Sequence, residues 1–138
     1  MKRHPALINL SQEHHGALVI GKKLKTAAQA NNQSAITLWQ SNRLLFLQEL
    51  LAHFTEEEER FGALLEGELK QEFESDHAFL LHCLQSDAQL INIDVSSAQE
   101  ATRRITAFAD RLIQHVRFEE RTLFPWLEQH HAQALKHL

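Results

Sequence analysis

Residues 46–64 and 108–126 repeat one helical pattern at an offset of 62 residues. In each segment apolar residues recur at the three- and four-residue spacing of a single helix face, with a His and a Glu four residues apart in its middle. The matched positions are Phe46, Leu50, His53, Glu57, Phe61 and Leu64 in the first segment, and Phe108, Leu112, His115, Glu119, Leu123 and Trp126 in the second. The chain therefore has the pattern of a duplicated two-helix unit.

The spacing of glycine and proline favours an all-α chain. Only 4 glycines and 2 prolines occur among 138 residues, and the stretches between them have a helical period, which excludes a turn-rich all-β fold. We predict four long helices: from Ser11 to about Asn31, from Ser34 to about Gly67, from Glu68 to Asn92, and from Ser97, which forms a capping box with Glu100, to Pro125.

The short connections between these helices predict an up-down-up-down four-helix bundle. Residues 128–138 are expected to form a short extra helix or to fray. A chain of 138 residues can bury one sizeable core, so we expect a single domain over 1–138 with its core at about 10–128.

Composition narrows the classes of function. The formal net charge is −4 and the Lys and Arg residues are scattered, so nucleic acid is not an expected partner. No apolar run approaches the roughly 18–20 residues of a membrane span, and residues 1–12 lack the pattern of a signal peptide, so we expect no membrane partner. The single cysteine, Cys83, excludes disulfides within the chain and thiolate metal clusters. It favours a reducing compartment, and we expect a cytoplasmic protein.

The repeated His and Glu carry the chemistry. His53 stacks over Glu57, and His115 over Glu119, because residues four apart share one side of a helix. Two ionised carboxylates that point into a core cost several kcal/mol each if they stay unpaired. A bound cation is the simplest way to offset that cost.

The other two helices supply further imidazoles. His77 faces largely inward, beside an apolar arc on the third helix. On the first helix the spacing favours His15, since 38 residues separate both His15 from His53 and His77 from His115. The helix face favours His14 instead, because His14 lies roughly 65° from the centre of the apolar arc whereas His15 falls among polar residues. We choose His14. A loop can take up a difference of one residue in the spacing, whereas a helix does not readily turn its polar face toward the core.

The predicted metal ligands are His14, His53, Glu57, His77, His115 and Glu119. Nitrogen and carboxylate ligands without thiolate suit Fe, Mn or Zn, and two carboxylates between two pairs of imidazoles are placed to bridge two metal ions. A ferritin-like site requires Glu-x-x-His on two helices and fails, because Leu112 lies three residues before His115. A haem held by two histidines would leave both glutamates unexplained.

These residues resemble the hemerythrin-like HHE cation-binding family. The resemblance covers residues 10–128 and is carried by the doubled His-x-x-x-Glu and by Leu123-Phe124-Pro125. It implies a four-helix bundle that holds two Fe ions with a bridging oxo or hydroxo group. Oxygen-carrying hemerythrins have a further His on the third helix, where this chain has Leu81. The remaining set of four His and two Glu is similar to that of the iron–sulfur-cluster repair proteins of the same superfamily, although the 138 residues of this chain do not include the cysteine-bearing N-terminal domain often joined to them.

We therefore expect a non-haem di-iron protein that binds or senses a small diatomic ligand, such as O₂ or NO, or peroxide. The competing hypothesis is an iron-handling or iron–sulfur-cluster repair factor that releases iron. No catalytic residue is assigned. The remaining acidic residues near the pattern, Glu56, Glu58, Glu59 and Glu120, are expected to be a solvated charge run.

Overall fold

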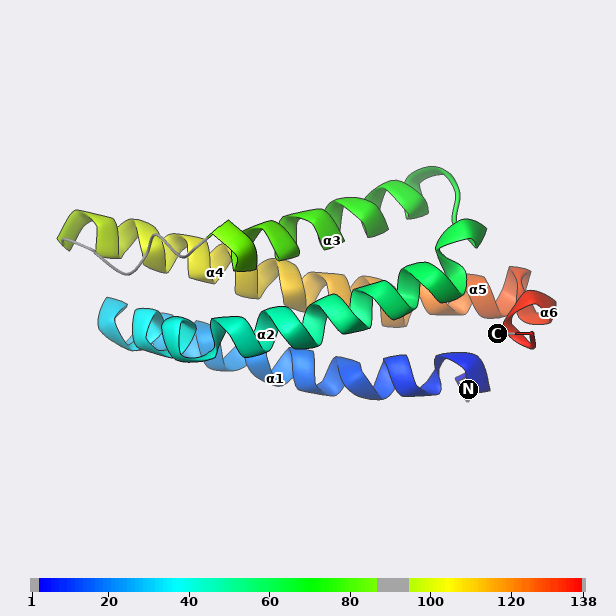
Figure 1. Cartoon of the computed structure of the whole chain (residues 1–138), viewed down its shortest axis with the longest axis horizontal. Coiled ribbons are helices and arrows are strands. Elements are labelled where there is room, and N and C mark those ends of the chain that lie inside the picture. Colours follow the sequence, from blue (N-terminus) through cyan, green and yellow to red (C-terminus); the bar gives the residue numbers. More distant parts are fainter. Residues whose placement is uncertain (1–2, 87–94, 138) are drawn as a thin grey trace.

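The structure is a computed structural model that describes residues 3–86 and 95–137. Within these ranges it is helical and contains no strand, which confirms the all-α prediction. The longest helices are α1 (Ile8–Ala30), α2 (Asn32–Phe61), α3 (Gly67–Ser86) and α4 (Val95–Phe118). They lie lengthwise beside one another, and consecutive helices run in opposite directions (Figure 1).

Helix α1 begins earlier than predicted. A 3-10 turn, η1 (Pro5–Leu7), leads into it, and His4 caps this turn because its Nδ1 accepts the backbone N–H of Ala6 at 3.0 Å. The predicted start at Ser11 is therefore wrong. Ser11 lies inside the helix, and its hydroxyl donates to the Glu120 carboxylate at 2.7 Å.

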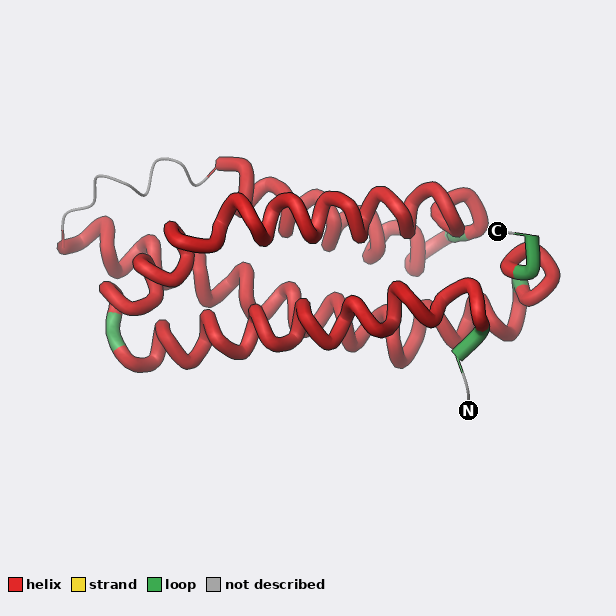
Figure 2. The backbone as a smooth tube through the Cα atoms, turned by 60° about the horizontal axis from the view of Figure 1, so that its bottom comes forward, coloured by secondary structure: helices red, strands yellow, loops and turns green. Residues whose placement is uncertain are grey.

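The turn between α1 and α2 lies where the Asn pair predicted it (Figure 2). Asn31 is extended, and its side-chain oxygen accepts the backbone N–H of Ser34 at 2.7 Å, so it caps α2. Helix α2 ends at Phe61 rather than near Gly67, and a 3-10 turn, η2 (Gly62–Leu64), follows. Gly67, with φ +60, then supplies the left-handed conformation that lets the chain turn into α3.

The predicted capping box on the fourth helix is wrong. Helix α4 begins at Val95, so Ser97 lies inside it. The Glu100 carboxylate lies with arginines further along the helix, accepting from Arg103 Nη2 at 2.6 Å and lying 3.5 Å from Arg104 Nε. The predicted end of the third helix near Asn92 falls outside the described residues.

Contrary to the prediction, the helical path does not end at Pro125, but its type changes in the turn before this residue. Helix α4 continues into a π-helical turn, η4 (Glu119–Leu123), and then into α5 (Phe124–His130). In this wider turn the N–H of Phe124 bonds to the carbonyl of Glu119, five residues back. The missing N–H of Pro125 would face the carbonyl of Glu120, and Arg3 Nη2 donates to that oxygen instead, at 3.2 Å.

The chain closes with α6 (Ala132–Leu135), near the end of the molecule where α1 begins (Figure 1). This agrees with the predicted short extra helix, and Leu135 is buried. Arg3 ties the start of the chain to α5, because its Nη1 lies 2.7 Å from Glu128 Oε1.

Two apolar clusters form the core. One includes Trp39, Phe54 and Phe108, and the other, nearer the termini, includes Phe61, Phe73 and Phe124. Among the described residues, no helix is both long and apolar enough to cross a membrane.

Candidate metal centre

The six predicted ligands come together between the two apolar clusters. Helix α1 contributes one, α2 two, α3 one and α4 one, and the sixth is the first residue of η4. All six are buried, with residue exposures between 0 and 7%. They are His14, His53, Glu57, His77, His115 and Glu119. Such complete burial of two carboxylates among four imidazoles is costly unless charge balances it.

One group of ligand atoms lies between α1 and α2. His14 Nε2 is 2.8 Å from Glu119 Oε1 and 3.9 Å from Glu57 Oε2. His53 Nε2 is 3.4 Å from the same Glu57 oxygen. These four residues each offer a ligand atom within 4.8 Å of the others, so they can hold a metal ion.

A second group lies between α3 and α4 and uses the same two carboxylates. His77 Nε2 is 3.2 Å from Glu57 Oε1, and His115 Nε2 is 3.2 Å from Glu119 Oε1. Its four ligand atoms also lie within 4.8 Å of one another. Because Glu57 and Glu119 belong to both groups, the geometry suits two cations that share the carboxylates.

Several of these atoms have no hydrogen-bond partner within the described part of the chain. Both oxygens of Glu57 are buried and unpartnered, as are the Nε2 atoms of His53, His77 and His115 and one oxygen of Glu119. Unsatisfied buried polar atoms are rare in proteins and call for a ligand. The donor set, imidazole nitrogen and carboxylate oxygen, fits iron, manganese or zinc.

The carboxylates lie in contrasting charge environments. Burial and the neighbouring Glu119 charge raise the pKa of Glu57 well above its usual range. Burial is the largest single effect on Glu119 and acts in the same direction. The positive charge of His115 and the hydrogen bonds with Glu57, His115 and His14 together outweigh it and hold the pKa of Glu119 well below the usual range.

The imidazoles respond to the same charges. Burial lowers the pKa of His53, and burial together with the charge of His115 lowers the pKa of His77 to about 3. For His115 burial is the largest single effect and lowers the pKa, but the Glu119 charge and the hydrogen bonds to Asp76 and Glu119 together outweigh it and raise the pKa to about 9. Negative charge between the ring nitrogens is what would attract a cation there.

Each of the four imidazoles has a further carboxylate near its Nδ1 atom, on the side of the ring that faces away from Glu57 and Glu119. Asp76 Oδ2 lies 2.8 Å from His115 Nδ1, and Glu120 Oε2 lies 2.9 Å from His14 Nδ1. Carboxylates that hydrogen-bond the outer nitrogen of a metal-binding His fix its ring and raise its basicity.

The other two outer carboxylates are more distant and more exposed. Glu13 Oε2 lies 3.2 Å from His53 Nδ1, and Glu58 Oε1 lies 3.7 Å from His77 Nδ1. Their side chains are 47% and 54% exposed, against 7% for Asp76 and 29% for Glu120.

Sequence reasoning missed these outer carboxylates. The solvated charge run predicted for Glu120 is wrong, because this residue is half-buried and hydrogen-bonded to His14 and Ser11. A signal was present, since each outer carboxylate directly precedes or follows a predicted ligand. Each one faces an imidazole on a neighbouring helix, however, so only the packing of the helices reveals its partner.

The two candidates on α1 face opposite ways. His14 is 3% exposed and lies in the cluster, whereas His15 is exposed on the outside of the helix. Phe124 stacks on the His14 ring, with centroids 5.4 Å apart. The helix-face criterion thus predicted the orientation of both side chains, and the equal spacing of 38 residues did not.

The model of one protein family, the hemerythrin HHE cation binding domain, matches residues 6–127. The chain belongs to this family. Searches among curated proteins and among solved structures found no match. Membership of the hemerythrin HHE family implies that the chain binds metal cations, and its His and Glu clusters provide groups that can do so.

Proposed function

We propose that this hemerythrin HHE domain holds two iron ions in an up-down-up-down four-helix bundle and binds a small ligand there, such as O₂, NO or peroxide. The observation that carries the proposal is the sharing of Glu57 and Glu119 between two pairs of buried histidines. His14 and His53 would be terminal ligands of one ion, and His77 and His115 of the other. Manganese or zinc suits the same donor atoms.

A bound pair of iron ions supplies Lewis acidity and redox chemistry that side chains lack. The chain's own contribution is to fix the imidazoles and to bury the carboxylates Glu57 and Glu119. Phe54 stacks on His77 with ring centroids 3.9 Å apart, and Phe73 lies against its ring at 4.1 Å. These rings make the surroundings of the centre apolar, which favours small neutral ligands over charged ones.

A second candidate is an iron-handling or cluster-repair factor that gives up iron. One observation favours it: Glu13 and Glu58 are exposed to solvent, and neither forms an ion pair with Lys or Arg in the described part of the chain. The rings of His53 and His77 are therefore less restrained at their Nδ1 atoms than the rings of His14 and His115. A cytoplasmic location would suit either function, and a chain with Cys83 as its one cysteine is compatible with a reducing compartment.

The deciding experiment is the metal content of protein purified without a histidine tag and loaded anaerobically with ferrous iron. Two irons per chain are expected from the two ligand groups. Reversible spectral changes with O₂ or NO would then support the ligand-binding function. Rapid transfer of iron to a chelator and to an apo iron–sulfur protein would support the second candidate instead. Occupancy by zinc alone after iron loading would contradict both.

A further inference from the structure

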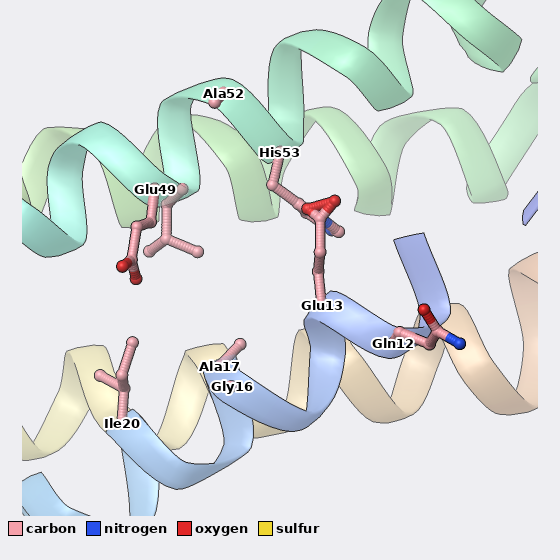
Figure 3. A pocket seen from close by; sticks show the side chains of 9 residues that line it. Gln12, Glu13, Gly16, Ala17, Ile20, Glu49, Ala52 and His53 are labelled. Atoms are coloured by element: carbon pink, nitrogen blue, oxygen red, sulfur yellow. The ribbon is translucent and has the colours of Figure 1, made fainter. Parts of the chain in front are cut away.

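A pocket of about 430 Å³ lies between α1 and α2 (Figure 3). Its lining includes His53, which is one of the six cluster residues. Its walls combine small and apolar residues, among them Gly16, Ala17 and Ala52, with polar and charged ones. The pocket is much larger than a water molecule, which occupies about 30 Å³ in the liquid.

His53 is the least covered of the four cluster histidines. It is 7% exposed, whereas the others are between 1 and 3% exposed. Among the described residues no ring stacks face to face on it, since its contacts with His14 and Phe54 are edge-on, with ring centroids 5.0 and 6.0 Å apart. Its Nε2 lacks a hydrogen-bond partner within the described residues. The pocket therefore leads to the most exposed of the four imidazoles.

The charges along the pocket have one sign. Glu13 and Glu49 line it, and none of its lining residues is Lys or Arg. In Figure 3 the Glu13 side chain extends from α1 toward His53, and Glu49 lies nearby on α2. Carboxylates in a cleft with apolar walls concentrate cations and speed their association.

We propose that metal cations reach the centre through this pocket, guided by Glu49 and Glu13 and received by His53. The inference rests on the proposed function, because it needs the six-residue cluster to bind cations. In this route Glu13 controls access to His53. Its carboxylate lies 3.2 Å from His53 Nδ1, so it must move away from the ring if His53 turns toward an incoming ion.

Gly16 offers a way to close the pocket without disturbing the core. A Cβ atom added there meets no atom within 4 Å, and glycine is a poor helix former, so larger residues suit its place in α1. We would replace it in order of size, with Gly16→Ala as the matched control and Gly16→Leu and Gly16→Phe as the test. Ala52→Phe would close the pocket from the α2 side.

The measurement is the rate at which Co²⁺ enters the metal-stripped full chain, followed by stopped-flow absorption, with the final Co²⁺ content determined by elemental analysis. Gly16→Phe and Ala52→Phe should slow uptake by about tenfold, equivalent to a barrier about 1.4 kcal/mol higher, without changing the final content. Gly16→Ala should load at nearly the wild-type rate. Wild-type rates in both Phe variants, with full final content, would overturn the proposed route.

A charge variant tests the guidance separately. Glu49→Gln should slow uptake at low ionic strength by roughly threefold to tenfold, and added salt should remove the difference. Glu59→Gln is the control, because Glu59 is an exposed carboxylate on the same helix that does not line the pocket. Equal slowing by both variants would overturn the guiding role of Glu49. If the wild-type chain bound no Co²⁺ at all, both the proposed function and the route would fail. If the variants instead took up a full content of Co²⁺ at the wild-type rate, only the route would fail.

Discussion

The two halves of the molecule, α1 with α2 and α3 with α4 and η4, carry the same pattern of ligands but anchor them differently. In the second half Asp76 lies behind His115, and Arg111 Nε fixes Asp76 from the other side at 2.6 Å. In the first half Glu13 occupies the matching place behind His53, at 3.2 Å, and no arginine or lysine pairs with it among the described residues. The repeat therefore matches in its candidate ligands and differs in the residues that contact them on the other side.

The same asymmetry appears where the halves meet. Glu120 lies behind His14, with the Ser11 hydroxyl at 2.7 Å and Arg3 Nη2 at 3.5 Å from its Oε1. Glu58 lies behind His77 at 3.7 Å and is mostly exposed. Each candidate cation position thus combines two kinds of imidazole. One has a mostly buried carboxylate near its Nδ1 atom, and the other has a more exposed and more distant one. We infer that one His of each pair holds its place before metal binds and the other adjusts.

The strongest test removes a carboxylate that both halves share. Glu57→Ala should abolish binding of the second cation, because each ligand group would be left with Glu119 as its sole carboxylate. Elemental analysis after anaerobic iron loading measures this effect. Glu59→Ala, at an exposed position on the same helix, should keep both ions. Wild-type stoichiometry in Glu57→Ala would remove the bridging role.

The next largest effect separates two adjacent histidines. His14→Ala should weaken iron binding far more than His15→Ala, because only the first side chain reaches the carboxylates, at 2.8 Å from Glu119. Titration with ferrous iron under anaerobic conditions compares their affinities. Equal losses in both variants, or a larger loss in His15→Ala, would show that the buried position of His14 does not mark it as a ligand.

The outer carboxylates test the comparison directly. Asp76→Asn should lower metal affinity by about 10- to 100-fold, the usual cost of losing a partner behind a ligating His. Glu13→Gln should lower it only a few-fold, since its longer and more exposed contact contributes less. Competition with a chelator of known affinity gives both numbers. Losses of the same size would mean that the two halves are equivalent despite their different anchors.

The smallest effect concerns the arginines. Arg111→Met should weaken the second cation position modestly, because Asp76 would lose its 2.6 Å contact yet keep its hydrogen bond to His115. Arg3→Met should act similarly on the His14 side, through Glu120. Thermal unfolding of metal-loaded and metal-stripped samples separates the two roles. A fall in melting temperature that is the same in both samples would assign the arginines to general stability alone.

Much of this arrangement follows from local sequence. The scarcity of Gly and Pro and the helical period predict the all-α fold, and the match to residues 6–127 agrees with the resemblance drawn from the doubled His-x-x-x-Glu. Helix geometry alone stacks His53 near Glu57 and His115 near Glu119, since residues four apart share a face. The apolar residues on the same face of α1 likewise predict that the His14 side chain points inward.

Helix boundaries were less predictable because they depend on contacts from elsewhere. Ser11 has the chemistry of a cap, yet its hydroxyl bonds to Glu120 on η4, and the helix begins three residues earlier. The π turn before Pro125 is accompanied by a bond from Arg3, 117 residues away, to the carbonyl of Glu120. Neither long-range bond has a signal in the local sequence.

The sequence by itself determined the types of candidate ligand, their spacing along each helix and the face on which they lie, because all three are set within a few residues by the geometry of the helix. Only the tertiary structure decided which carboxylate supports which imidazole. Asp76 precedes His77 but faces His115, and Glu13 precedes His14 but faces His53. Adjacent residues on a helix point about 100° apart, so a carboxylate beside one ligand reaches a ligand of the neighbouring helix once the helices pack together.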